Sequence, residues 1–201
     1  MPARRLAPFL LLVAAWFLLM SVLWWLATPV LAWPVAILSE LVTRVCFGDL
    51  VRAVEQQNEI ITFVTSLRPA DAAYANGAKA VLLVPSNVRL FSFGLPLLAA
   101  LILAAREPHV LRNLLIGYVA LLPFQTFSVV ADFLKYIAIE AGPSITVQTG
   151  FNALQLNVIA FCYQFGTLIL PTVAPAIVWV LMHRRFLENF AGRDRTPSEV
   201  S

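Results

Sequence analysis

The fold of this chain depends on the stretch at residues 40–89, ELVTRVCFGDLVRAVEQQNEIITFVTSLRPADAAYANGAKAVLLVPSNVR. It is the only long segment that mixes charged and apolar residues as a water-facing structure does. The segments around it are apolar runs of membrane length, and the first of them, from Leu6 to Ser39, carries no charge. This pattern predicts an integral membrane protein with one extramembrane insertion after its first span.

The composition favours the same class of protein. Of 201 residues, 60% are hydrophobic and only 12% are charged, whereas soluble domains are about a quarter charged. The net charge is +3 and the basic residues are scattered, so no nucleic-acid partner is expected. The uncharged run behind Arg4 and Arg5 is longer than the apolar core of about 7–15 residues in a cleaved signal peptide. An uncleaved membrane anchor is therefore the preferred interpretation.

Four apolar segments are candidates for membrane helices, which need roughly 20 residues. They cover residues 7–27, 90–105, 113–136 and 154–182. The second is short and relies on Arg89 extending toward the membrane surface. Pro29 is expected to end or kink the first helix, because proline lacks an amide donor and clashes with the preceding turn. A separate amphipathic helix is predicted from Pro34 to Cys46, lying on the outer membrane surface or packed on its own insertion.

The insertion at residues 40–89 is predicted to hold a small α+β structure, a helix followed by a β-hairpin. The expected hairpin strands are Leu50–Glu55 and Glu59–Leu67. They flank a polar turn, and the second strand alternates apolar and polar residues. Residues 80–84 are a possible third strand, and Arg68–Gly77 resembles a loop. A lone hairpin is marginally stable in water, so we expect this lobe to lean on the helix, the membrane or a partner.

Short-loop positive charge predicts the orientation. The N-terminus, the Arg106–Arg112 connection and the C-terminal tail hold eight basic and four acidic residues, and the other side holds six basic and seven acidic residues. We therefore expect both termini in the cytoplasm, the insertion outside, and a disordered cytoplasmic tail at 191–201. The fold class predicted is an all-α polytopic membrane protein with four transmembrane helices and this extracytoplasmic insertion, forming a single membrane domain over residues 1–201.

Polar residues form a stripe on each of the last two predicted spans. The stripes consist of Tyr118, Gln125, Ser128, Asp132 and Lys135 on the third span, and Asn157, Gln164 and Thr167 on the fourth. At 100° per residue each set falls on one helix face. Interhelical hydrogen bonding is the favoured role, and a functional polar groove or a partner contact is the alternative. For Asp132 and Lys135, a structural ion pair is preferred over a proton relay or substrate site.

Catalytic interpretations find little support. A thiol nucleophile needs a base within reach, but His109 and His183 are predicted at cytoplasmic helix ends, whereas Cys46 is predicted outside. Cys162 is predicted to be mid-span packing. The sequence contains no metal-ligand spacing and no phosphate-binding glycine loop, so we expect no catalytic residue, no metal and no cofactor.

Several short stretches resemble one family of bacterial proteins. They are VEQQ at residues 54–57, ITFVT at 61–65, GLPLL at 94–98, YQFG at 163–166 and RRFLE at 184–188. Their content and order resemble the small membrane proteins associated with exosortase H in Gram-negative bacteria. The resemblance implies a place beside a system that sorts proteins carrying a C-terminal anchoring signal at the inner membrane.

That resemblance also bears on activity. It implies a sorting enzyme with a Cys, Arg and His set, and in this chain no cysteine and histidine are predicted to meet outside the membrane. The chain is therefore expected to be a non-enzymatic accessory protein whose partners are the lipid bilayer and other membrane proteins, including an exosortase. The competing hypothesis is a membrane enzyme or transport-complex subunit that uses a polar groove between the third and fourth spans.

Overall fold

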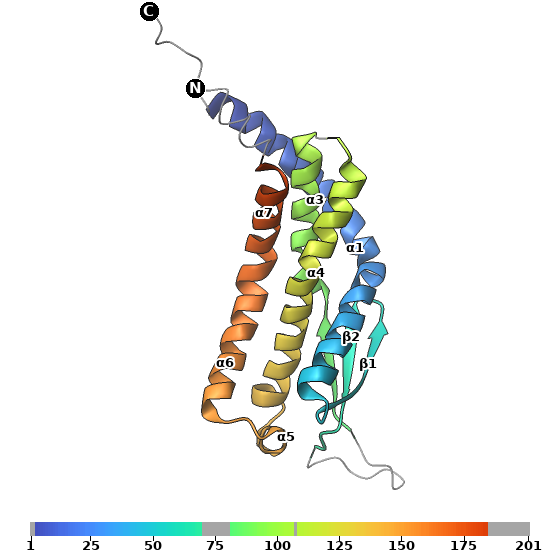
Figure 1. Cartoon of the computed structure of the whole chain (residues 1–201), viewed down its shortest axis with the longest axis vertical. Coiled ribbons are helices and arrows are strands. Elements are labelled where there is room, and N and C mark those ends of the chain that lie inside the picture. Colours follow the sequence, from blue (N-terminus) through green and yellow to red (C-terminus); the bar gives the residue numbers. More distant parts are fainter. Residues whose placement is uncertain (1–2, 70–80, 107, 185–201) are drawn as a thin grey trace, which may run out of the picture.

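The computed structural model describes residues 3–69, 81–106 and 108–184. Long helices run side by side, and a small antiparallel sheet lies against one half of their length (Figure 1). The helices are α1 (Ala3–Phe47), α2 (Arg89–Ser92), α3 (Gly94–Ala105), α4 (Val110–Lys135), α5 (Pro143–Thr149), α6 (Ala153–Gln164) and α7 (Leu170–Met182). Two π-helical turns, η1 (Tyr136–Glu140) and η2 (Phe165–Ile169), extend α4 and join α6 to α7.

Among the described residues, three helical stretches are long and apolar enough to cross a membrane. They are Ala7–Phe47, Val110–Glu140 and Ala153–Met182. The apolar helix at Arg89–Ala105 is shorter than these, so the four predicted spans are not all confirmed. The start of α1, the α3–α4 connection and the end of α7 lie at the same end of the molecule (Figure 1). The predicted tail at 191–201 and most of the Arg68–Gly77 loop lie outside the described residues.

The predicted end of the first helix at Pro29 is wrong. Helix α1 continues through Pro29 and Pro34 to Phe47, although its course changes direction along the way (Figure 1). Proline at position 29 leaves the Trp25 carbonyl without its usual helical donor. The Arg89 guanidinium donates to that carbonyl at 3.4 Å, so a side chain from the insertion replaces part of the lost bonding. Packing on other elements thus overrides the local signal to stop.

The C-terminal half of α1 packs on the sheet through its smaller residues. Its larger apolar residues point outward, and Leu41 and Val45 are exposed, at 58% and 76%. The buried face consists instead of small residues, including Ala32, Ser39 and Thr43. Small side chains let another element approach closely, and here that element is the sheet. The segment is therefore the end of α1 rather than a separate helix, and it packs on its own insertion, which is one of the two predicted placements.

The predicted hairpin is confirmed, and a third strand completes the sheet. Strands β1 (Val51–Gln57) and β2 (Ile60–Thr65) pair with Gln57 opposite Ile60, so the turn consists of Asn58 and Glu59. Asn58 has φ +55°, a conformation that asparagine adopts more readily than most residues. The third strand, β3 (Leu83–Asn87), begins later than the predicted 80–84 and includes Pro85, which was expected to follow it. As an edge strand, β3 tolerates a proline.

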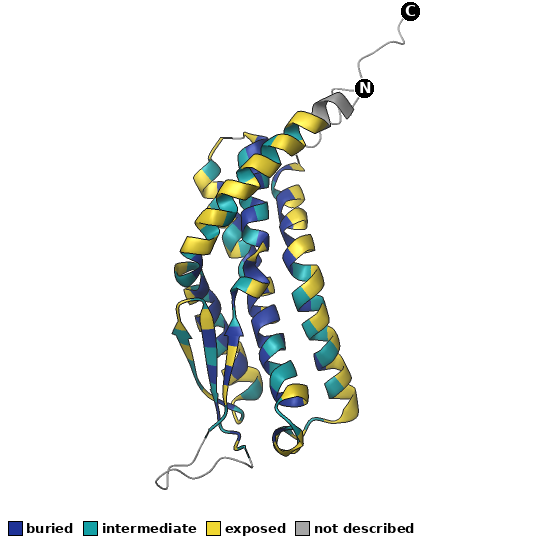
Figure 2. Cartoon of the chain, turned by 180° about the vertical axis from the view of Figure 1, so that it is seen from behind, coloured by how far each residue is buried: buried dark blue, intermediate teal, exposed yellow. Residues whose placement is uncertain are grey.

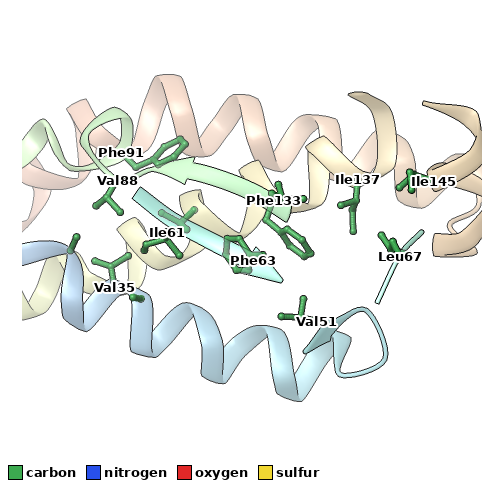
Figure 3. Close-up of a cluster of buried hydrophobic side chains, with 14 residues drawn as sticks. Val35, Val51, Ile61, Phe63, Leu67, Val88, Phe91, Phe133, Ile137 and Ile145 are labelled. Atoms are coloured by element: carbon green, nitrogen blue, oxygen red, sulfur yellow. The ribbon is translucent and has the colours of Figure 1, made fainter. Parts of the chain in front are cut away.

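One face of the sheet is buried in the helix bundle (Figure 3). Ile61 and Phe63 on β2 are fully buried, as the predicted alternation requires. Phe63 stacks on Phe133 of α4 with ring centroids 4.4 Å apart. The cluster extends from α1 through all three strands to α4, η1 and α5. The insertion is therefore wedged between α1 and α4 and shares their core, rather than standing apart as a displayed lobe.

At the other half of the bundle, α3 and α7 cross closely at Gly94. A Cβ atom placed there would lie 2.2 Å from the Pro171 carbonyl oxygen, so only glycine fits. Around this crossing a second apolar cluster joins α3, α4 and α7. The buried helix faces turn inward and the exposed faces form much of the outer surface (Figure 2). This is the pattern expected of helices whose outer faces contact lipid.

Candidate functional site

The sheet meets the bundle through a hydrogen bond at Asp132. Ser86 Oγ, on β3, donates to Asp132 Oδ2, on α4, at 2.7 Å. Hydrogen bonds to a charged acceptor are stronger than those between neutral groups, and this one lies beside the stacked pair Phe63 and Phe133. Asp132 therefore anchors the insertion to α4.

Lys135 makes separate contacts. Its Nζ atom lies 2.7 Å from Glu140 Oε1 and 4.2 Å from the centre of the Tyr163 ring. The preferred ion pair between Asp132 and Lys135 is therefore not formed: each residue has a different partner. The reason is geometric, since the π-helical turn η1 carries Glu140 back toward Lys135 while β3 presents Ser86 to Asp132. Lys135 thus links α4, η1 and α6.

Two other members of the α4 stripe connect helices. Tyr118 donates its hydroxyl proton to the Leu31 carbonyl of α1 at 2.9 Å. Ser128 Oγ lies 2.8 Å from the Gly166 carbonyl of η2, and also bonds its own helix at Phe124. A Cβ atom at Gly166 would lie 3.0 Å from Ser128 Oγ, so the missing side chain permits this close contact. These residues do the bridging expected of interhelical polar contacts.

Gln125 and its neighbour Thr126 are buried, and part of their hydrogen-bonding capacity is unused. In the described part of the chain, Gln125 Oε1 and Thr126 Oγ1 have no partner. A buried polar atom without a hydrogen bond costs free energy. Thr126 also lines an apolar groove between α1, α4 and α6. These two atoms are the unsatisfied polar groups of α4.

The polar residues of the fourth predicted span point elsewhere. Asn157 and Gln164 are exposed on α6, and neither side chain makes a hydrogen bond with any described residue. Thr167, in η2, donates to the Tyr163 carbonyl of its own helix at 2.8 Å. The structure therefore divides the eight stripe residues among several contacts and does not gather them around a single groove. A partner contact through the exposed pair stays a prediction.

Sequence reasoning missed the role of Arg89, which was expected to extend to the membrane surface. Its Nη1 atom pairs with Glu59 of the hairpin turn at 2.7 Å, and its guanidinium lies 4.0 Å from the centre of the Trp25 ring. A guanidinium over an indole face is a favourable cation–π arrangement. Gln56, also near the turn, donates to the Pro29 carbonyl at 2.7 Å. The hairpin turn is thus fixed to the middle of α1.

An apolar groove that sequence reasoning also missed lies between the C-terminal parts of α1 and α4 and most of the length of α6. It has a volume of about 660 Å³. Leu38 and Val42 of α1 line one wall, Leu154 and Val158 of α6 line the other, and α4 forms the floor. No sequence signal pointed to this groove, because its residues come from three separated segments that read as ordinary membrane helix.

The reactive side chains of the described residues are dispersed. No group of three or more His, Cys, Asp or Glu residues among them is arranged to hold a metal ion. Cys46 and Cys162 are free thiols, the first exposed and the second partly buried. His183 is buried at the end of α7, with Nδ1 3.1 Å from the Trp179 carbonyl. The main features of the helix bundle are therefore polar contacts between its own elements and an apolar groove. The groove suits binding to another molecule.

The fold and these features define a helical membrane protein with a sheet built into one half of its helix bundle. The model of one family, described as exosortase H-associated membrane protein, matches residues 3–186. The chain belongs to this family, as the short motifs at 54–57, 94–98 and 163–166 indicated. No curated protein and no solved structure matches the chain.

Proposed function

We propose that this protein is a non-enzymatic accessory subunit that acts by binding an exosortase in the bacterial inner membrane. The family description associates its members with exosortase H. The observation that carries the proposal is the 660 Å³ groove with its apolar walls. A surface of this kind, on a chain with membrane-length helices, suits contact with another membrane-embedded molecule.

The proposal includes a topology with four spans and both termini in the cytoplasm. The second span in chain order is the short helix at Arg89–Ala105, whose 17 residues extend about 25 Å at the usual helical rise, close to the roughly 30 Å hydrocarbon core. Arg106, Arg112 and Arg184 then lie on the cytoplasmic side, in agreement with the positive-inside rule. In this topology the sheet lies on the outer side, packed against α1 and α4.

A second candidate function is a membrane enzyme or transport-complex subunit that uses the polar residues of α4. The observation in its favour is the pair of unsatisfied buried atoms, Gln125 Oε1 and Thr126 Oγ1. A transport path or reaction centre needs such groups to converge on one space. The stripe residues instead bond to α1, β3, η1 and η2, which favours the accessory role.

The two functions are separated by a double variant, Asp132→Asn with Lys135→Gln, assayed for exosortase co-purification and for sorting of an anchored substrate. If the protein acts by binding, any loss of sorting should be matched by loss of the co-purified exosortase. Normal co-purification with lost sorting would support the enzyme or transport function instead. Variants Gln125→Ala and Thr126→Ala, which leave the sheet joint intact, provide a second test of the same distinction.

A further inference from the structure

We propose that the helix bundle binds one buried water molecule, which joins the Gln125 carboxamide of α4 to the Pro171 carbonyl of α7. The site is a cavity of about 10 Å³ between α3, α4 and α7. It lies inside the bundle and needs no partner protein, so the inference goes beyond the accessory function. The argument depends on two proline-freed carbonyl groups, on the buried amide of Gln125 and on the size of the cavity.

The prolines at the start of α7 leave two carbonyl oxygens without their usual helical donors. In the π-helical turn η2, the Leu170 amide bonds to the Phe165 carbonyl five residues earlier. The next amide in that pattern would bond to the Gly166 carbonyl, but it belongs to Pro171, which has no amide hydrogen. Four residues further on, Pro175 likewise has no hydrogen to donate to the Pro171 carbonyl. Both oxygens are therefore available to donors from outside the helix.

Helix α4 presents one polar side chain to each of these carbonyl groups. Ser128 Oγ lies 2.8 Å from the Gly166 carbonyl oxygen and bonds to it directly. Gln125, one turn earlier on α4, lines the same cavity as Pro171. Gln125 is only 3% exposed, and its Oε1 atom has no partner among the described residues. A buried amide oxygen in a membrane-length helix needs such a partner, so a bridging molecule is required between α4 and α7.

The walls of the cavity supply enough polar groups to hold a water molecule, which needs two to four of them. Gln125, Ser128 and Pro171 all line it, and the Ser128 hydroxyl oxygen can accept a hydrogen bond while it donates to Gly166. The Pro171 oxygen is directed toward Gly94, which also lines the cavity. A Cβ atom at Gly94 would lie 2.2 Å from that oxygen, so the glycine keeps it accessible.

The size of the cavity identifies the ligand as water. One water molecule occupies about 10–15 Å³ when cavity space is measured in this way, and the cavity has about 10 Å³. An acyl chain or a side chain of a partner is too large for it. A hard metal cation takes about six oxygen ligands, more than these walls offer. A single water that donates to Gln125 Oε1 and to the Pro171 oxygen satisfies both groups.

The first test is a crystal structure of the full chain in lipid, at a resolution that shows ordered water molecules. We expect one isolated density peak about 2.5–3.2 Å from both the Gln125 carboxamide and the Pro171 oxygen. The peak should be missing in Gln125→Leu, which keeps most of the side chain's bulk. A wild-type cavity without the peak, a direct bond from Gln125 to a protein group, or continuous density from a lipid or detergent tail would each overturn the inference.

The second test gives the Pro171 carbonyl a donor of its own. Pro175→Ala adds an amide hydrogen four residues after Pro171, so this oxygen no longer depends on water. Gln125→Leu should lower the melting temperature of the chain in detergent, and by about half as much or less in the Pro175→Ala background. The matched control is Gln164→Leu, the same change at an exposed amide, which should have the same effect in both backgrounds. Equal effects of Gln125→Leu in the two backgrounds would contradict a bridge to Pro171.

Discussion

The hydrogen bond from Ser86 Oγ to Asp132 Oδ2, 2.7 Å long, joins an edge strand to a membrane-length helix across 46 positions of sequence. Together with the Phe63–Phe133 stack, it makes the sheet part of the bundle's core. An acidic residue in such a helix is usually taken as a functional group. Here its partner is structural, and the insertion and the helices form one folded unit.

The hydrogen bond between Ser86 and Asp132 predicts that substitutions at these two residues have coupled effects on stability. Asp132→Ala and Ser86→Ala should each lower the free energy of unfolding by about 1.5–3 kcal/mol, the usual range for a hydrogen bond to a charged group. The double variant should cost little more than the larger single effect, because both changes remove the same bond. Thermal unfolding in detergent measures all three. Additive losses would show that the two residues stabilise the protein independently.

The aromatic stack should hold the sheet to the bundle. Phe63→Ala should cost about 3–5 kcal/mol, as large-to-small changes in a core do, and should expose the hairpin to protease before the helices unfold. The matched control is Phe127→Ala, which removes an equally large side chain that is 40% exposed. A control variant that is cleaved as fast as Phe63→Ala would contradict the assignment of the core.

The α3–α7 crossing predicts a strong effect at one glycine. Gly94→Ala places a Cβ 2.2 Å from the Pro171 carbonyl, so the helices must move apart, at a cost of about 1–3 kcal/mol or more for overpacking. Gly150→Ala is the comparison, because Gly150 has φ +68° but no atom within 4 Å of its added Cβ, and should cost only about 1 kcal/mol. Equal shifts in melting temperature would argue against the close crossing.

Arg89 is predicted to matter through its shape as well as its charge. Arg89→Lys keeps a positive charge near Glu59 but loses the planar group over Trp25 and its reach to the Trp25 carbonyl. We expect it to lose about half the stability that Arg89→Ala loses, measured by unfolding in detergent. Arg52→Lys, on β1 and without a described ion pair, is the control. If Arg89→Lys matched the wild type, the cation–π contact and carbonyl bond would contribute nothing measurable.

Much of the architecture could be predicted from particular residues. The alternation of Ile61 and Phe63 located the hairpin, and the uncharged runs located the long helices. The continuity of α1 could not be predicted, because Pro29 is a local signal to stop and its compensation comes from Arg89, 60 residues later. The face through which α1 packs on the sheet could not be predicted for a related reason: in a membrane protein large apolar residues can face lipid while small ones pack inside.

The candidate site was predicted less well. The polar stripe residues were identified correctly as unusual, but helical periodicity gives a direction on one helix and not the neighbour in that direction. Thus Asp132 bonds to Ser86 and Lys135 pairs with Glu140. The one-turn spacing of Asp132 and Lys135 favoured an ion pair between these two residues instead. The groove depends on which faces of α1, α4 and α6 are covered, and only the assembled helices determine that.

The predicted orientation can be checked with the native thiol of Cys46, which is exposed at the end of α1. In a Cys162→Ser background, a membrane-impermeant maleimide should label Cys46 in cells whose outer membrane is permeabilised. A cysteine at Arg112 in a background lacking Cys46 should react only after the inner membrane is opened. Labelling in the reverse order would place the sheet in the cytoplasm.

The most direct test of the accessory role is the ratio of exosortase to this chain after tag-based purification from native membranes at native expression levels. The account predicts that exosortase co-purifies at a fixed ratio that persists through a second column and is unchanged in Gln125→Ala. A closed homo-oligomer of this chain, purified without exosortase from membranes that contain it, would contradict the account.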